Sequence, residues 1–127
     1  MKVLHVEAGM HLYGGALQVV FLLRGLKARG IDCVLACPTG SAIAAEAAPH
    51  AQVVEMTMRG DADVGLTGRL RALIRAERPD VVHLHSRRGS DLWGALAGKL
   101  EGVPVVLSRR VDNPEARWVV NLKYRLY

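Results

Sequence analysis

Short apolar runs alternate along the chain with longer segments whose apolar residues recur every three or four positions. The short runs predict five strands, over residues 2–7, 31–37, 51–56, 80–85 and 104–108. The longer segments predict four helices, over residues 14–29, 41–48, 66–74 and 92–100. Gly30 directly follows the first of these helices and Gly102 lies two residues after the last, where a glycine commonly ends a helix. The pattern therefore predicts a regular alternation of strands and helices.

Strands that alternate with helices through short connections predict a parallel sheet with right-handed crossovers. The strands are almost continuously apolar, so helices should cover both faces of the sheet. We expect one α/β domain with a doubly wound, Rossmann-like parallel sheet of strand order 3-2-1-4-5. A chain of 127 residues is long enough for one such domain with a substantial core.

Residues 114–127 predict one more helix, which no glycine, asparagine or proline ends. Its apolar positions, at helical spacing, are Trp118, Val119, Leu122 and Leu126. Such a stripe requires a cover, either from a partner chain in a dimer or from further parts of a longer protein. We favour the second alternative and expect residues 1–127 to be a truncated domain.

The composition indicates a globular domain with a basic C-terminal third. Half of the residues are apolar, and the net charge is +5. Residues 1–85 carry a balance of +1, whereas residues 86–127 carry +4. The basic excess suits an anionic substrate, an acidic membrane surface or nucleic acid, or it is an ordinary solvated surface. Neither a helix-turn-helix pattern nor interleaved aromatic residues are visible, so we expect no nucleic acid partner.

Cysteine usage and hydropathy favour a cytoplasmic protein. Cys33 and Cys37 fall in one predicted strand, about 13 Å apart, which excludes a disulfide between them. We interpret both as buried thiols of a reducing compartment. The sequence shows neither a secretory signal nor an apolar run of transmembrane length. We expect a cytoplasmic location, with peripheral contact to the inner face of the membrane as an additional expectation.

The richest chemistry lies where the predicted strand 80–85 meets the following helix. His85, Ser86, Arg87 and Arg88 occupy this junction. In an open parallel sheet, such a junction lies at the carboxyl edge, where ligands bind. Guanidinium groups, an imidazole and the N–H groups of a helix start suit an anionic or polyhydroxylated ligand.

A second basic pair follows the neighbouring predicted strand. Arg109 and Arg110 come directly after residues 104–108, so both pairs should lie on the same edge of the sheet. Asp112 and Asn113 belong to the same loop, where they could form hydrogen bonds with hydroxyl groups or cap the final helix. Together these residues predict one wall of an anion-facing cleft.

Two histidines precede this junction, and we expect different roles for them. His83 and His85 are two residues apart on a strand and therefore share a face. We expect His83 to be packed and hydrogen-bonded in the core. We expect His85, at the end of the strand, to open into the cleft as a ligand contact or general base. A two-histidine metal site lacks an obvious third ligand in the sequence, so we expect no metal.

The first strand-to-helix loop carries Gly14 and Gly15 at the predicted helix start. Two glycines allow a ligand to approach the backbone, and the N–H groups of a helix start attract negative charge. The loop lacks the Gly-x-Gly-x-x-Gly fingerprint, and Gly15 stands where a phosphate-binding P-loop has lysine. A catalytic triad, a nucleophile elbow and paired carboxylates are not apparent in the sequence either.

Several of these stretches together resemble the N-terminal domain of retaining glycosyltransferases of the GT-B fold, family 4. The stretches that carry the resemblance are residues 13–16, 26–30, 37–41, 79–86 and 102–106. Residues 79–86 read Pro-Asp-Val-Val-His-Leu-His-Ser. Residues 85–114 look most like members that build lipopolysaccharide or related cell-surface glycans.

The resemblance implies that this chain forms the acceptor-binding part of an enzyme. That enzyme would transfer a sugar from a nucleotide-diphosphate sugar to a glycan or glycolipid. The resemblance also implies that Gly14 and Gly15 approach the donor diphosphate and that His85 lies beside the transferring sugar or the acceptor. The family holds most of the donor in a second domain that this chain does not resemble. We therefore expect no sugar transfer by residues 1–127 alone, and no cofactor besides the donor.

Seven further residues are assigned to the acceptor as a hypothesis. They are Ser86, Arg87, Arg88, Arg109, Arg110, Asp112 and Asn113. The four arginines among them are less general in the family, and we assign them to an anionic acceptor. The alternative function is a stand-alone Rossmann-like module that binds a phosphorylated metabolite.

Overall fold

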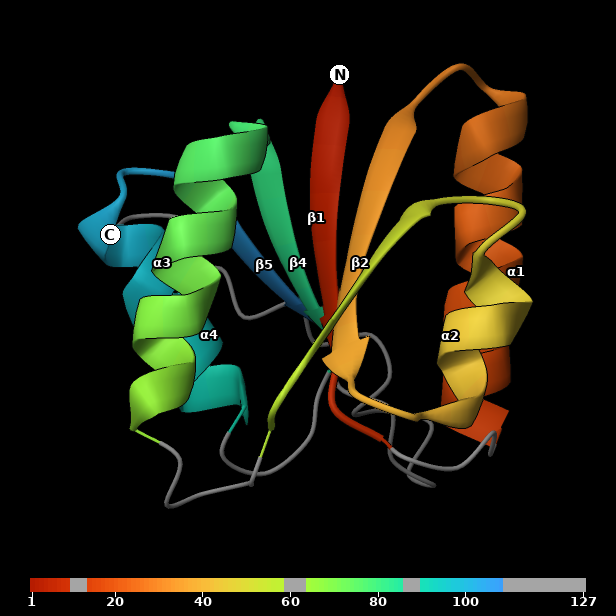
Figure 1. Ribbon diagram of the computed structural model, residues 1–127. Helices are drawn as coiled ribbons and strands as arrows, with labels where there is room; N and C mark the ends of the chain where they lie inside the picture. Colours follow the sequence, from red (N-terminus) through yellow and green to blue (C-terminus); the bar gives the residue numbers. More distant parts are fainter. Residues whose placement is uncertain (10–13, 59–63, 86–89, 109–127) are drawn as a thin grey trace.

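The computed structural model describes residues 1–9, 14–58, 64–85 and 90–108, and these form a single parallel sheet with helices on both faces (Figure 1). The strands are β1 (Lys2–Glu7), β2 (Asp32–Pro38), β3 (Gln52–Met56), β4 (Val81–His85) and β5 (Val105–Ser108). The helices are α1 (Gly14–Ala28), α2 (Ala42–Ala47), α3 (Gly65–Glu77) and α4 (Ser90–Leu100). Each element lies within three residues of its predicted bounds.

The sheet has the order β3-β2-β1-β4-β5, and every pair of neighbouring strands is parallel. This confirms the predicted doubly wound, Rossmann-like topology. Strand β1 is central and pairs with β2 on one side and β4 on the other. The register places His5 level with His83 and Glu7 level with His85. The order of the strands reverses between β1 and β4, so the topological switch point lies between these two strands.

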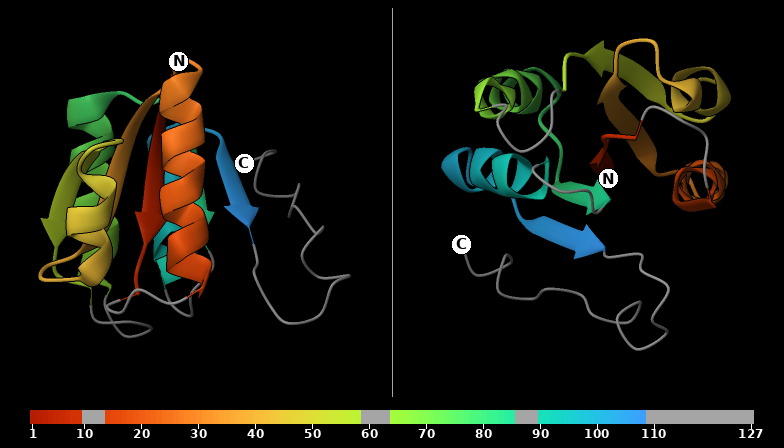
Figure 2. Two further views of the ribbon diagram at one scale, coloured as in Figure 1. Left: turned by 90° about the vertical axis from the view of Figure 1, so that its right-hand side faces the viewer. Right: turned by 90° about the horizontal axis from the view of Figure 1, so that it is seen from below.

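Two hydrophobic cores lie on opposite faces of the sheet. Helices α3 and α4 cover one face, where Leu4 and Leu84 of the sheet meet Leu70 and Leu73 of α3. Helices α1 and α2 cover the other face over β1, β2 and β3, where Leu35 meets Leu23 of α1 (Figure 2). Successive side chains of a strand point to opposite faces, so strands that are apolar throughout can support both cores.

Helix α4 approaches the sheet through two glycines. A Cβ atom on Gly94 would lie 2.6 Å from Cδ2 of Leu84 in β4. A Cβ atom on Gly98 would lie 2.4 Å from Cγ2 of Val105 in β5. Both separations are too short for real atoms, so the closeness of α4 to β4 and β5 depends on the missing side chains.

The ends of α3 and α4 are joined by charged side chains. Glu101, directly after α4, accepts hydrogen bonds from Nε of Arg71 at 2.7 Å and Nε of Arg75 at 2.9 Å. These bonds, from Arg75 first and then Arg71, hold the pKa of Glu101 below its usual range. The two helices are thus tied together on the face away from the α1 and α2 core.

Both cysteines are buried free thiols of β2, as predicted. Burial is the main cause that raises the pKa of Cys33 and of Cys37. A buried thiol with a raised pKa holds little thiolate at neutral pH, so neither residue is suited to nucleophilic chemistry.

Ser41 precedes α2 in the extended backbone conformation of a helix cap, but its hydroxyl makes no capping hydrogen bond. The Ser41 side chain is buried. Residues 114–127, for which the sequence predicts a final helix, lie outside the described residues.

Candidate functional site

The candidate site is the carboxyl edge of the sheet at the switch point between β1 and β4. β1 ends at Glu7 and the chain next forms α1, while β4 ends at His85 and the chain next forms α4. Because both strands run in the same direction and are paired, the start of α1 and the start of α4 belong to the same edge (Figures 1 and 2). In open α/β sheets, ligands bind in the crevice that such a reversal of strand order creates.

Gly14 and Gly15 are the first two residues of α1, as predicted. The helix is 15 residues long and carries no acidic residue in its first turn. The partial positive charge of its N-terminal N–H groups is therefore not offset by a carboxylate within the turn. This end of α1 has the electrostatic character of an anion-binding helix start.

The position of His85 differs from the expectation. Its side chain is 1% exposed and does not open into a cleft. Nε2 of His85 lies 3.1 Å from Nδ1 of His5, so one ring donates an N–H to the other. Its ring partner His5 belongs to the paired strand β1, where it is level with His83, two residues before His85. The catalytic role suggested for His85 stays a prediction, and it has to operate from a buried position.

His83 is hydrogen-bonded, as predicted, but it is less buried than His85. Nε2 of His83 lies 2.6 Å from Oγ of Ser108 on β5. Its side chain is half-buried, whereas those of His5 and His85 are buried. The sequence predicts that His83 is more buried than His85, whereas in the structure His85 is the more buried of the two.

Three polar residues beside His83 and His85 were not identified from the sequence. His5, Glu7 and Ser108 lie on the same face as His83 and His85, because residues in register on neighbouring strands share a face. His5 and Glu7 are both buried. The available signal was two polar residues at alternating positions in the otherwise apolar segment 2–7. Combined with the predicted pairing of the first and fourth strands, this spacing would have placed them beside the two histidines.

The three imidazoles lie close together across β1 and β4, and we call them the histidine cluster (His5, His83 and His85). The ring centroids of His83 and His85 are 4.2 Å apart. The ring of His5 lies 5.4 Å from that of His83 and 5.3 Å from that of His85. One nitrogen of each ring can be chosen so that all three lie within 4.8 Å of one another. The cluster can exchange protons between rings or offer several nitrogen lone pairs to one ion.

The remaining predicted site residues lie outside the described part of the chain. They are Ser86, Arg87, Arg88, Arg109, Arg110, Asp112 and Asn113. The structure does place the ends of β4 and β5 next to each other, with His85 level with Ser108. The segments that carry the two arginine pairs therefore leave the sheet from adjacent strands.

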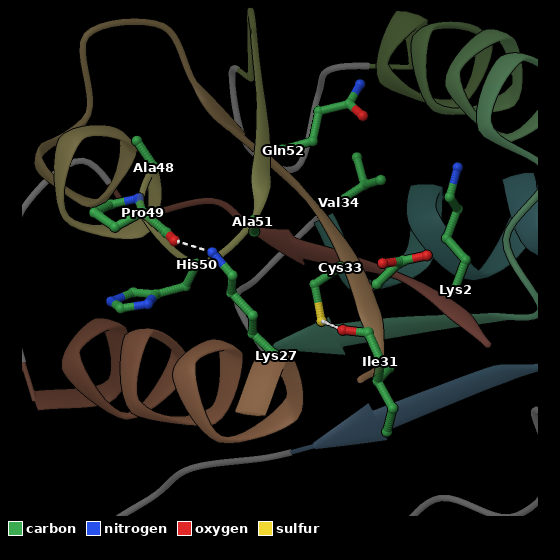
Figure 3. A pocket seen from close by; sticks show the side chains of 11 residues that line it. Lys2, Lys27, Ile31, Cys33, Val34, Ala48, Pro49, His50, Ala51 and Gln52 are labelled. Atoms are coloured by element: carbon green, nitrogen blue, oxygen red, sulfur yellow. Dashed lines mark hydrogen bonds between the residues drawn. The ribbon is translucent and has the colours of Figure 1, made fainter. Parts of the chain in front are cut away.

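A pocket of about 410 Å³ lies at the amino edge of the sheet, where the strands begin, opposite the carboxyl edge (Figure 3). It is formed around the start of β2 and the connection between α2 and β3, and Lys2, Lys27 and His50 contribute its basic groups. Nζ of Lys27 donates to the carbonyl oxygen of Pro49 at 2.7 Å, and Nζ of Lys2 bonds Glu77 at 3.2 Å. The ammonium groups of both lysines thus already bond to other groups of the chain. The pocket is also remote from the carboxyl edge.

Among the described residues, α1 to α4 are all too short or too polar to cross a membrane as a helix.

Solved structures with a similar fold come from proteins of more than one kind. MurG from Acinetobacter baumannii superposes with a TM-score of 0.67 and 14% identity over 85% of this chain and 34% of that protein. Anabaena Alr3699/HepE in complex with UDP and glucose has a TM-score of 0.66 and 17% identity, over 85% of this chain and 29% of that protein. A UDP-N-acetylglucosamine 2-epimerase has a TM-score of 0.65 and 18% identity, over 99% of this chain and 38% of that protein. At these identities the likeness shows the fold alone.

The chain spans about a third of the length of these structures. No match was found among curated protein sequences. The family model described as Glycosyltransferase Family 4 matches residues 13–125, which is most of the chain. The matched range contains both helix starts of the candidate edge. The chain therefore belongs to Glycosyltransferase Family 4.

Proposed function

We propose that this chain is the acceptor-side part of a retaining glycosyltransferase. The enzyme moves a sugar from a nucleotide-diphosphate sugar to a hydroxyl of a glycan or glycolipid. The observation that carries the proposal is the family match over residues 13–125, which includes the anion-suited start of α1 at the switch point. The Anabaena protein with UDP and glucose, which has the same fold, supports a nucleotide sugar as the donor.

In such a transfer, the bond between the sugar and the diphosphate breaks, and the acceptor hydroxyl forms the new bond and loses its proton. Negative charge develops on the departing diphosphate, so groups that stabilise this charge lower the barrier. We assign part of this stabilisation to the backbone N–H groups of Gly14 and Gly15. Residues that hold the rest of the donor belong to a second domain in this proposal, because the similar structures are about three times as long.

The acceptor in this proposal is anionic, as in lipopolysaccharide and other cell-surface glycans. The basic balance of +4 over residues 86–127 supports it, together with the adjacent exits of β4 and β5. Arg87, Arg88, Arg109 and Arg110 supply the charge, and a peripheral approach to the membrane surface follows from the same charge.

Replacing Gly15 with aspartate in the intact enzyme tests the donor site. We expect the affinity for the donor nucleotide to fall about tenfold, because a carboxylate at the helix start repels the diphosphate. The fold should be preserved, since a negative charge in the first turn stabilises a helix. Calorimetric titration with UDP, GDP and ADP would identify the nucleotide and measure the loss.

Gly25→Asp is the matched control for this substitution. Gly25 belongs to the same helix, and a Cβ atom there has open space around it. We expect this variant to bind the nucleotide with unchanged affinity. Equal losses for the two variants, or none for Gly15→Asp, would contradict the assignment of the diphosphate to the start of α1.

Reversing the charge of the four arginines tests the acceptor side. Changing Arg87, Arg88, Arg109 and Arg110 to glutamate should raise the KM for an anionic acceptor at least tenfold, because attraction becomes repulsion. The KM for the donor should change less than threefold. Steady-state kinetics with each substrate varied in turn would measure both values. A similar rise in the two KM values would contradict an acceptor role.

A further inference from the structure

We propose that the histidine cluster is a binding site for a transition-metal dication of the zinc class. His5, His83 and His85 would supply three imidazole ligands from two neighbouring strands. The site goes beyond the proposed sugar transfer, which assigns no metal to this chain. It is also independent of that proposal, because it rests only on the geometry of β1, β4 and β5.

The register of the sheet brings the three ligands together. His5 and His83 are level on paired strands, and His85 follows two residues later on the same face. The backbone of a central parallel sheet is rigid, so the Cα positions of the ligands are set before any ion binds. His5 and His85 are buried and His83 is half-buried, which leaves an approach from the side of His83.

The nitrogen separations are close to those that a tetrahedral ion needs. Zinc–nitrogen bonds of 2.0–2.1 Å imply ligand nitrogens about 3.3 Å apart. Nδ1 of His5 and Nε2 of His85 already lie 3.1 Å apart. All three ligand nitrogens lie within 4.8 Å of one another, so small shifts of the side chains bring them to bonding distance of one ion.

The chemistry of the ligands selects the class of metal. Three neutral imidazoles suit zinc, copper, nickel and cobalt, whereas magnesium and calcium prefer oxygen ligands. Three protein ligands leave one coordination position for water or another donor. On binding, the proton shared by His5 and His85 moves to the other nitrogen of the ring that carries it. Each ring then stays neutral with one N–H.

Two neighbouring groups support such a site. Ser108 bonds Nε2 of His83 at 2.6 Å, and a hydrogen bond of this kind fixes the orientation and tautomer of a metal-binding imidazole. Glu7 is buried, is level with His85 and lies on the same face of the sheet. The negative charge of its carboxylate offsets part of the charge of a buried dication.

Cobalt binding provides the test, on the intact protein with any purification tag removed and with metal first stripped by a chelator. We expect one equivalent of Co²⁺ to bind with the intense visible absorption of a tetrahedral site, and Zn²⁺ to displace it. His83→Gln should weaken binding about 100-fold or more, since loss of a supporting outer partner alone costs 10- to 100-fold. Ser108→Ala, which keeps all three ligands, should weaken it about tenfold.

His50→Gln is the matched control, because His50 lies at the opposite edge of the sheet and outside the histidine cluster. We expect it to bind cobalt as the unaltered protein does. Weak octahedral binding, a thiolate-to-cobalt charge-transfer band from Cys33 or Cys37, or unchanged binding by both His83→Gln and Ser108→Ala would overturn the proposal. These readouts do not involve the sugar donor, so they fail or succeed separately from the proposed function.

Discussion

Replacing Gly98 with alanine is expected to lower the free energy of unfolding by about 3 kcal/mol, the upper part of the range for overpacked cores. The added Cβ atom would lie 2.4 Å from Cγ2 of Val105 and 3.4 Å from the carbonyl oxygen of Val103. Val105 is 2% exposed and belongs to β5, and its branched side chain has few alternative rotamers. Relief therefore requires α4 to move away from the sheet. Urea unfolding followed by circular dichroism would measure the change.

Gly68→Ala in α3 is the matched control for this prediction. Gly68 is exposed, and a Cβ atom there meets nothing within 4 Å. We expect this variant to gain about 1 kcal/mol, because alanine has the higher helix propensity. The same substitution in two neighbouring helices should thus have opposite signs. A gain in stability for Gly98→Ala would show that α4 does not pack as closely as the structure describes.

Replacing His85 with alanine is expected to lower the free energy of unfolding by about 3 kcal/mol. The substitution removes a fully buried ring and leaves a cavity at the end of β4. It also removes the hydrogen-bond partner of Nδ1 of the buried His5. The loss of stability should therefore accompany any loss of sugar transfer, and urea unfolding would measure it.

His50→Ala serves as the control, since His50 is a half-buried residue at the other edge of the sheet. We expect it to change stability by less than about 0.5 kcal/mol. If His85→Ala abolished transfer with unchanged stability, His85 would be a catalytic group that contributes nothing to packing. That result would favour the expectation drawn from the sequence over the buried position in the structure.

The sheet order could be predicted because each step depends on local patterns and general rules. Short, mostly apolar segments of five to seven residues separated by amphipathic segments define the parallel α/β class, and right-handed crossovers limit the topologies. Some boundaries shifted by one to three residues. Asp80, for example, was expected inside the fourth strand, but its carboxylate accepts the backbone N–H of Lys2 and β4 begins at Val81.

The candidate site was predictable only in part. Gly14 and Gly15 begin α1 because two glycines after an apolar strand mark a strand-to-helix turn in this fold. The exposure of His85 was not predictable, since the period of a strand tells which residues share a face but not what covers that face. The roles of the arginine pairs stay predictions, because these residues lie outside the described part of the chain.

The sequence by itself determined the fold class, the strand order and the family, since these depend on patterns that local residues carry. Only the tertiary structure decided which polar residues meet. His5 and His85 are 80 residues apart in the chain, and their contact exists because β1 and β4 pair in one particular register. A shift of one residue in that register would turn the side chains that now face each other to opposite faces of the sheet. The histidine cluster is therefore a product of strand pairing, and no short motif encodes it.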